Sequence, residues 1–534
     1  MIEVDANFPG GAVTQVRFDE GNRIRFAAPL DGSPQSLWFY FRVRGVQGKQ
    51  LTLCQDQMEQ VLGVFESETY KRVQPVIREG EEGEWTRVPK HQTKFSIDPL
   101  EFRFTITPSR DTVYIAFSYP YTTEHFQHFI TSNPSPYLQQ TVLGRTKEGR
   151  PFPAVTIGEE DESNRIRKKL IVCQARQHAG EVSGSYVLEG IIKEALADTE
   201  QGRQLRKHMV LVVFPFVDLD GVQQGRYGKN RPPIDMGRDW SLEPNHPEIR
   251  MMQQEVERLA RQYDFTLFMD LHAPQPGGNC YLIPDRRFAM GQQQWGKFWS
   301  FYEAFGDAVS RVCTCGFDDF DADSINWSGI YYHQTSKHYY SSKYKATTMT
   351  LETSYHVDRQ GTLLTPDHWR SIGQIWLRVA QAYYSQPADI GWSELKRSHP
   401  SRDLLLEYWD MVKEPKHAKL IAIHKETFSF VSERDDGEMW MTCSTPFHAS
   451  VAAPGIQIDT DEGAPFQTEV ILYRFNDEVA LGEIISYYLH AANGSIVWQL
   501  PEEFHASVRD HAYKVSLRIS GLRGTAHVQV IATK

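Results

Sequence analysis

The alternation of hydrophobic and polar positions changes character twice along the chain, which divides it into three stretches. Between about residues 8 and 120, apolar and polar residues alternate in short runs such as Leu37–Val43, Phe102–Ile106 and Val113–Phe117. A period of two, with β-branched and aromatic residues between Gly-, Pro- and Asp-containing turns, is typical of a β-sandwich of short strands. This first stretch offers no candidate catalytic residue.

From about residue 140, apolar runs that predict buried strands alternate with helical patterns. One predicted helix carries Ile249, Met252, Val256 and Leu259 on a single face, and another has Thr365 as its N-cap with Pro366 at its first position. The alternation predicts an α/β domain with a mixed, mostly parallel sheet covered by helices. The predicted strands are Lys169–Cys173, Met209–Phe214, Phe265–His272 and Thr347–Glu352.

After Pro387 the period of two returns, which predicts a second small β domain. Its expected strands are Leu420–Ile423, Val470–Tyr473, Val515–Ile519 and Val528–Ile531. The pattern therefore predicts a multidomain protein: an N-terminal β-sandwich over 1–130, an α/β catalytic domain over 131–388 and a C-terminal β-sandwich accessory domain over 389–534.

Composition narrows the functional classes. The 534 residues are 40% hydrophobic and carry a net charge of −11, with acidic and basic residues interspersed. Nucleic acid and anionic membranes are therefore not expected as partners. The six cysteines form no Cys-x-x-Cys pair, and no apolar run approaches the ~20 residues of a membrane helix. We expect a cytoplasmic protein.

The first candidate for chemistry is His178-Ala179-Gly180-Glu181, which follows an apolar strand and precedes a helix. A neutral imidazole and a carboxylate at such a strand-to-helix turn are suited to binding zinc, with a third ligand from another strand. The local sequence is equally compatible with a helix-capping glutamate beside a surface histidine.

His272 is the proposed third ligand because it ends an apolar strand directly before a Pro/Gly loop. A histidine in that place is by itself more often an ordinary loop residue. Two histidines and a glutamate, however, match a catalytic zinc site that keeps one position for water. Asp270, two residues earlier on the same strand face, could accept a hydrogen bond from a ligand and orient it.

Glu352 lies in a strand of otherwise small or apolar residues. On the strand pattern alone it would be a solvent-facing residue. Next to a zinc triad we favour a general base that takes a proton from zinc-activated water.

These features occur together with further landmarks, and the sequence resembles the zinc metallocarboxypeptidases of the carboxypeptidase A type. The likeness is to the cytosolic carboxypeptidase branch and its bacterial relatives. It covers roughly residues 100 to 385 and rests on several motifs in a fixed order: Ala116–Thr122, Gly144–Arg150, His178–Glu181, Asp218–Val222, Asp235–Trp240, His272 and Thr350–Ser354.

The resemblance implies one zinc ion held by His178, Glu181 and His272, with Glu352 as general base. It also implies that Arg238 grips the terminal carboxylate of the substrate, a role suited to a bidentate guanidinium. Without the landmarks, Arg238 would be interpreted as a surface ion-pair residue. Tyr331 or Tyr332 is the candidate for the tyrosine that usually lines such a site.

Two positions depart from the family pattern. Gly237 stands where the family usually has asparagine, and Gly228 stands where it often has an arginine that polarises the scissile carbonyl. Arg226, Lys229 or Arg231 could supply the missing charge from the same loop.

We therefore predict a zinc-dependent carboxypeptidase that hydrolyses the C-terminal amide bond of a peptide. The two glycines keep two alternatives open. One is a zinc amidohydrolase acting on an N-acyl amino acid or a cell-wall γ-glutamyl peptide. The other is a zinc-containing binding module without catalysis, against which Glu352 argues.

Overall fold

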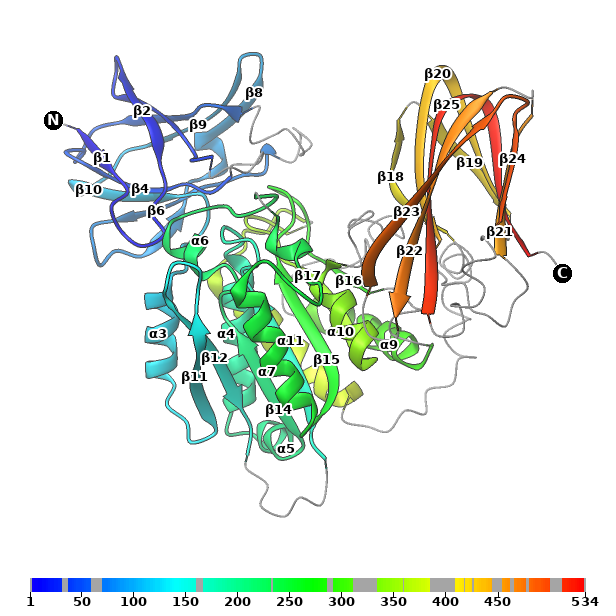
Figure 1. Ribbon diagram of the computed structural model, residues 1–534. Helices are drawn as coiled ribbons and strands as arrows, with labels where there is room; N and C mark the ends of the chain where they lie inside the picture. The colour runs from blue at the N-terminus through cyan, green and yellow to red at the C-terminus, as the bar shows by residue number, and fades with distance from the viewer. Residues whose placement is uncertain are drawn as a thin grey trace.

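The structure is a computed structural model, and its ribbon shows two β-rich parts at one end of an α/β body (Figure 1). It describes residues 2–30, 37–58, 70–159, 167–231, 234–285, 292–310, 334–358 and 360–384, followed by 409–416, 418–424, 427–443, 454–461, 465–476, 480–499 and 511–532.

The N-terminal domain contains two five-stranded sheets. Their apolar faces meet in an aromatic core in which the Phe26 ring contacts Phe39 and Phe41 from the opposite sheet. This packing confirms the predicted period of two. One sheet is β1 (Glu3–Asp5), β4 (Tyr40–Arg44), β10 (Thr112–Ala116), β6 (Val76–Glu79) and β7 (Trp85–Arg87); the other is β2 (Thr14–Asp19), β3 (Arg23–Ala27), β5 (Leu51–Gln55), β9 (Leu100–Ile106) and β8 (Thr93–Ile97), with the short helix η1 (Lys90–Gln92) before β8.

A seven-stranded mixed sheet forms the middle of the α/β domain. Its four central strands are parallel and nearly all of their residues are buried, so their sequences are continuous apolar runs rather than alternating ones. The strand order is β11 (Leu138–Arg145), β12 (Pro151–Ile157), β14 (Met209–Phe214), β13 (Lys169–Ala175), β15 (Asp264–His272), β17 (Thr347–Glu352) and β16 (Tyr281–Pro284).

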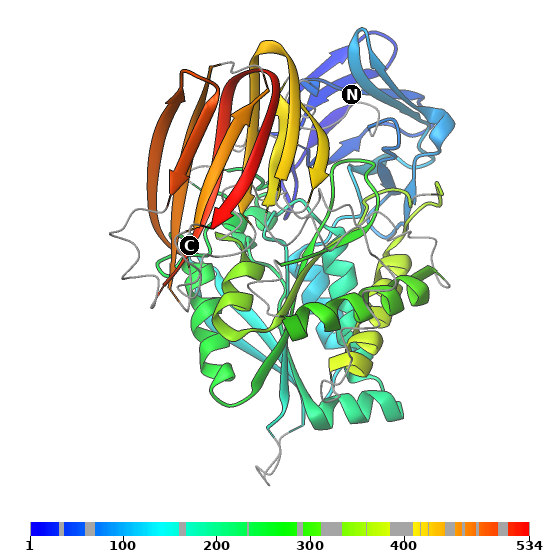
Figure 2. The same ribbon diagram turned by 90° about the vertical axis from the view of Figure 1, so that its right-hand side faces the viewer.

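Helices cover both faces of this sheet, as the turned view shows (Figure 2). On one face α4 packs closely on α11, because Gly190 and Gly373 let each backbone approach the other. Both predicted helices are confirmed as α7 and α11. The helices are α3 (Thr123–Ser132), α4 (Ser183–Leu196), α5 (Glu200–His208), α6 (Leu219–Gln223), η2 (Met236–Arg238), α7 (Pro247–Ala260), α9 (Gln292–Ser310), α10 (Ser336–Tyr344) and α11 (Pro366–Tyr384).

The last part of the chain is β-rich, and its strands pair in a single network. Two of the predicted strands were wrongly separated: Val515–Ile519 and Val528–Ile531 belong to one long strand, β25, which passes through Gly521 and Gly524. Register shifts against β20 accommodate those glycines. The strands are β18 (Trp409–Lys416), β19 (Ala418–His424), β20 (Thr427–Cys443), β21 (Pro454–Thr460), β22 (Phe466–Asn476), β23 (Ala480–Ala491), β24 (Ser495–Gln499) and β25 (His511–Ala532). The division of this part into two packed layers and the domain limits 1–130, 131–388 and 389–534 stay predictions.

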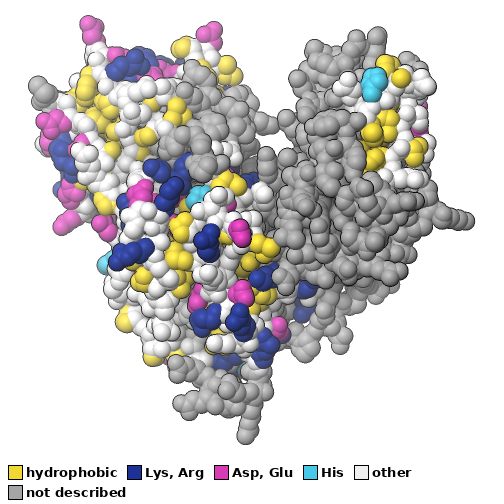
Figure 3. Space-filling view, in the orientation of Figure 1, with side chains coloured by type: hydrophobic (Ala, Val, Ile, Leu, Met, Phe, Trp, Pro, Cys, Tyr) yellow, Lys and Arg dark blue, Asp and Glu magenta, His cyan; other side chains and the backbone are white. Residues whose placement is uncertain are grey.

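Basic and acidic side chains are interspersed on the face of the catalytic domain seen in Figure 3. Among the helices that the structure describes, none has the length and apolar character required to cross a membrane.

Candidate active site

The proposed metal ligands meet where the parallel strands end. His272 is the last residue of β15 and faces Glu352, the last residue of the neighbouring strand β17, in the strand register. The third strand, β13, ends at Ala175 and leads through a short loop to His178 and Glu181. Because the carboxyl ends of parallel strands open on the same crevice, residues far apart in sequence converge there.

The three proposed ligands form a compact, buried group. One donor atom from each of His178, Glu181 and His272 lies within 4.8 Å of the others. The Nδ1 atoms of both histidines face Glu181, His178 at 2.9 Å from Oε1 and His272 at 2.7 Å from Oε2. Two imidazole nitrogens and a carboxylate are the donor set of a catalytic zinc ion with an open position, so the residues fit zinc.

A carboxylate contacts the second ring nitrogen, Nε2, of each proposed histidine ligand. Nε2 of His178 lies 3.1 Å from Oδ1 of Asp235, and Nε2 of His272 lies 3.2 Å from Oδ2 of Asp270. Such contacts fix the ring orientation and direct Nδ1 toward a metal. The prediction that Asp270 orients a ligand thus agrees with its position. Asp235 entered the sequence prediction only as a landmark, because its loop gives no strand register from which to place it.

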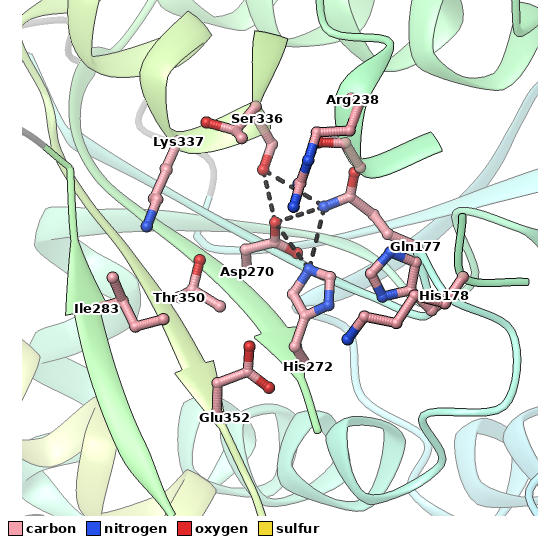
Figure 4. Close-up of a pocket in the computed structure, with 13 residues that line it drawn as sticks. Gln177, His178, Arg238, Asp270, His272, Ile283, Ser336, Lys337, Thr350 and Glu352 are labelled. Carbon is pink, nitrogen blue, oxygen red and sulfur yellow. Dashed lines mark hydrogen bonds and ion pairs between the residues drawn. The ribbon is translucent and has the colours of Figure 1, made fainter. Parts of the chain in front are cut away.

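A hydrogen-bonded network surrounds Asp270. Gln177 and Ser336 both donate to its Oδ2, and Trp240 in turn donates to Gln177 over 2.7 Å. Figure 4 shows Asp270 joined by dashed lines to Gln177 and Ser336, with Glu352 below it in this view. Gln177 and Ser336 were not predicted from the sequence; the position of Gln177, directly before His178, was the one available signal.

The loop that carries His178 is fixed by its own side chains. Arg176 adopts a left-handed backbone conformation with φ of 64° and donates to the carbonyls of Ala179 and Tyr121. A Cβ on Gly180 would lie 2.7 Å from the Tyr227 ring, so this position requires glycine. The spacing between His178 and Glu181 is thus held by close packing.

Glu352 is buried at the pocket wall with 4% of its surface exposed. Its Oε2 has no hydrogen-bond partner among the described residues. Burial raises the pKa of Glu352, and the nearby Glu181 carboxylate adds to the rise although His272 opposes it. A carboxylate with a raised pKa and an unpaired oxygen in the pocket can accept a proton.

The three candidate cations of the loop that contains Gly228, namely Arg226, Lys229 and Arg231, have different surroundings in the structure. Lys229 lines the pocket, and its Nζ lies 3.4 Å from Oε1 of Glu181. Arg231 instead forms an ion pair with Asp218 at 3.3 Å, and Arg226 does not line the pocket. Burial would lower the pKa of Lys229, but Glu181 beside it raises that pKa above its usual value. The Glu181 carboxylate thus favours the charged form of the Lys229 ammonium.

Both departures from the family pattern have a structural reason. Gly228 has φ of +88°, and a Cβ there would lie 2.8 Å from the Ala179 nitrogen, so this backbone excludes an arginine. A Cβ on Gly237 would lie 3.0 Å from the Asp235 carboxylate and 3.3 Å from Nε2 of His178. Each glycine lets its loop approach the metal-binding loop closely.

Arg238 and Lys337 are the other cations of the pocket wall. Arg238 comes from η2, and Lys337, which was not predicted from the sequence, comes from the first turn of α10 beside Ile283 and Thr350. Nζ of Lys337 donates to the Pro284 carbonyl over 3.3 Å. Tyr331 and Tyr332 lie outside the described residues.

Comparisons with known proteins agree with this geometry. Residues 123–355 match the zinc carboxypeptidase family, and residues 4–118 match the cytosolic carboxypeptidase N-terminal domain. Cytosolic carboxypeptidase 6 of Mus musculus is 26% identical over 292 residues, covering 51% of this chain and 53% of the relative. Cytosolic carboxypeptidase 2 of Danio rerio is 26% identical over 297 residues, covering 51% of this chain and 40% of the relative. The chain thus spans about half the length of these curated relatives.

Solved structures share the fold. A metallo-carboxypeptidase from Burkholderia cenocepacia superposes with a TM-score of 0.60 at 21% identity, covering 72% of this chain and 98% of the other. A metallo-carboxypeptidase from Pseudomonas aeruginosa gives a TM-score of 0.59 at 19% identity, covering 72% and 100%. With two consecutive domain matches and a metal group that fits zinc, the chain carries a zinc carboxypeptidase domain over residues 123–355, preceded by a cytosolic carboxypeptidase N-terminal domain over residues 4–118.

Proposed function

We propose that this protein is a zinc-dependent carboxypeptidase that hydrolyses the C-terminal amide bond of a peptide. The observation that carries the proposal is the buried Glu352 carboxylate, which faces His272 across two paired strand ends in a pocket that also holds His178. A site that only bound a metal would have no use for a buried carboxylate with an unpaired oxygen.

His178, Glu181 and His272 would hold the zinc ion. When bound, zinc supplies a Lewis acid that polarises the scissile carbonyl and activates water. Glu352 accepts the proton of the attacking water at its free Oε2 and passes it to the leaving amine. Asp235 and Asp270 keep the two imidazoles oriented throughout.

The pocket cations would bind and orient the substrate. Arg238 is suited to the terminal carboxylate, because a guanidinium can donate two parallel hydrogen bonds. Lys229, next to the metal group, would stabilise the negative charge that develops on the carbonyl oxygen. Lys337 lies near the apolar Ile283 and would contact the last side chain of the substrate, favouring a side chain that accepts hydrogen bonds.

One specific observation supports the alternative of an amidohydrolase for N-acyl amino acids or γ-glutamyl peptides. Gly228 and Gly237 remove two side chains from the usual clamp. Hydrolysis rates on matched peptides with free and amidated C-termini, and on N-acyl amino acids, separate the two functions. A preference for N-acyl amino acids would replace our proposal. A cytoplasmic location is also proposed, in line with the names of the curated relatives.

The mechanism is tested with Glu352→Gln, which keeps the shape of the side chain but removes the base. We expect turnover of a responsive peptide to fall about 1,000-fold while one zinc ion per chain is retained. Glu248→Gln is the matched control, since Glu248 is also a buried glutamate but lies at the start of α7, outside the pocket. Full activity of Glu352→Gln with zinc bound would exclude this mechanism.

A further inference from the structure

Arg87, at the end of β7 in the N-terminal domain, reaches across the domain boundary to the chain that follows Glu352. Its Nε and Nη2 donate to the Leu364 carbonyl over 3.1 and 2.9 Å, and Nη2 also donates to the Tyr355 carbonyl. Nη1 donates to the Gln74 carbonyl over 2.8 Å and lies 3.0 Å from Nδ1 of His356. All five N–H groups of the guanidinium thus have an acceptor.

The acceptors of Arg87 are carbonyl oxygens and a ring nitrogen instead of a carboxylate. A surface ion pair would need only a positive charge, which lysine also provides. Contacting the carbonyls of Tyr355, Leu364 and Gln74 together with His356 uses all five donors of the planar guanidinium, two more than a lysine ammonium has. The geometry therefore indicates that Arg87 holds backbone in place.

The backbone that Arg87 holds begins three residues after Glu352 and is fastened at several points. Ser118 donates to the Tyr355 carbonyl over 3.1 Å, and Phe117 packs on Tyr355 with ring centroids 5.1 Å apart. The Leu364 N–H donates to the His356 carbonyl over 2.9 Å, which closes this segment into a loop. We call residues 353–358 and 360–364 the base-strand loop.

Glu352 is positioned mainly through its backbone. Its Oε2 makes no hydrogen bond within the described part of the chain, so the carboxylate is positioned by the backbone at the end of β17. That backbone is paired with His272 of β15 on one side and with Tyr281 of β16 on the other. After Glu352 the chain runs directly into the base-strand loop.

We propose that Arg87 is a positioning residue for Glu352: through the base-strand loop, the N-terminal domain completes the active site of the catalytic domain. This inference rests on the proposed function for its effect on turnover, but its structural part does not. The N-terminal domain then helps to position a catalytic residue, although its sequence pattern offered no candidate for chemistry.

The test compares Arg87→Ala and Arg87→Lys with Arg78→Ala. Arg78 lies on the adjacent strand β6 and stacks on Trp85 and Tyr114 of its own domain, so its loss perturbs the same sheet without touching the base-strand loop. Amide hydrogen exchange is measured on peptides from 353–364 and from 169–181, together with zinc content, kcat and KM.

We expect Arg87→Ala to exchange faster in 353–364 only, to keep one zinc ion, and to lose about 10- to 100-fold in kcat, as small displacements of catalytic groups do. KM should stay within about twofold, because substrate binding is not altered. Added guanidinium ion should restore part of the kcat of Arg87→Ala. Arg78→Ala should show none of these effects.

Unchanged exchange in 353–364, or faster exchange with wild-type kcat, would overturn the inference. If Arg87→Ala does not fold, Arg87→Lys and Ser118→Ala, each of which removes only part of the contacts to Tyr355, take its place with the same criteria. If the wild-type protein hydrolyses no peptide, the proposed function fails, and the exchange data still decide whether Arg87 holds the loop.

Discussion

The metal end and the substrate end of the pocket are built from different kinds of structure. At the metal end, His272 and Glu352 are the last residues of paired parallel strands, and both histidines are braced by carboxylates. At the substrate end, Lys229 comes from a loop, Arg238 from a short helix and Lys337 from the first turn of α10. Strand register fixes the first group, whereas the second depends on loop contacts that can change without altering the fold.

The sharpest test of this contrast is Lys229→Met. If Lys229 stabilises charge on the substrate, kcat should fall about 100-fold, the cost of removing one such donor. Zinc content should stay at one ion per chain, because His178, Glu181 and His272 are unchanged. Arg226→Met is the control from the same loop, since Arg226 does not line the pocket. Loss of zinc in Lys229→Met would instead place Lys229 with the metal end.

Asp235→Asn tests the carboxylate that contacts His178 at the metal end. The amide can still meet Nε2 of His178 but lacks the charge, so we expect zinc affinity to weaken about 10- to 100-fold. Competition with a chromophoric chelator measures it. Asp239→Asn, a buried carboxylate on the same loop that bonds Asn245 and His246, serves as control. Equal zinc affinity in both variants would show that the loop as a whole, and not the hydrogen bond to His178, determines how tightly zinc binds.

Lys337→Met should alter selectivity more than rate. Removing this cation should reduce the preference for acidic or amide side chains at the substrate terminus about tenfold relative to aliphatic ones, a typical value for one charged hydrogen bond. Ratios of kcat/KM on peptides that differ only in the last residue provide the measurement. Identical ratios in the variant and the wild type would remove Lys337 from the substrate end.

The smallest expected effect is on the pH dependence of stability and concerns His356. This residue accepts a hydrogen bond from Arg87 at the domain boundary. Burial lowers the pKa of His356 well below its usual value, and the charge of Arg87 lowers it further. The unfolded chain therefore binds this proton first, so stability is present above about pH 6.5 and decreases below it by up to about 1.4 kcal/mol per pH unit.

His356→Asn keeps an acceptor without a titrating group, so its melting temperature should fall less between pH 7 and pH 5.5 than that of the wild type. His128→Asn, on the exposed side of α3, is the control. A wild-type pH dependence in His356→Asn would mean that other groups govern stability in this range.

Sequence reasoning reached the metal end because its residues follow apolar strands. The strand pattern by itself places His272 and Glu352 at the ends of parallel strands, and His178 and Glu181 at a strand-to-helix turn. Lys337 and Asp235 could not be placed, because no periodicity connects a loop or a helix start to a distant pocket. The contacts of Arg87 could not be predicted from the sequence either. The alternation along a strand shows which side chains face inward, but not which residues of another domain they contact.

The pairing of His272 with Glu352 also bears on how the protein folds. A slip of one residue between β15 and β17 would turn one of these side chains to the opposite face of the sheet, and no metal group would form. Parallel pairing between distant segments forms slowly, because a long stretch of chain must close first. Tight zinc uptake should therefore lag behind secondary structure during refolding, and the ion would report when the central sheet has reached its correct alignment.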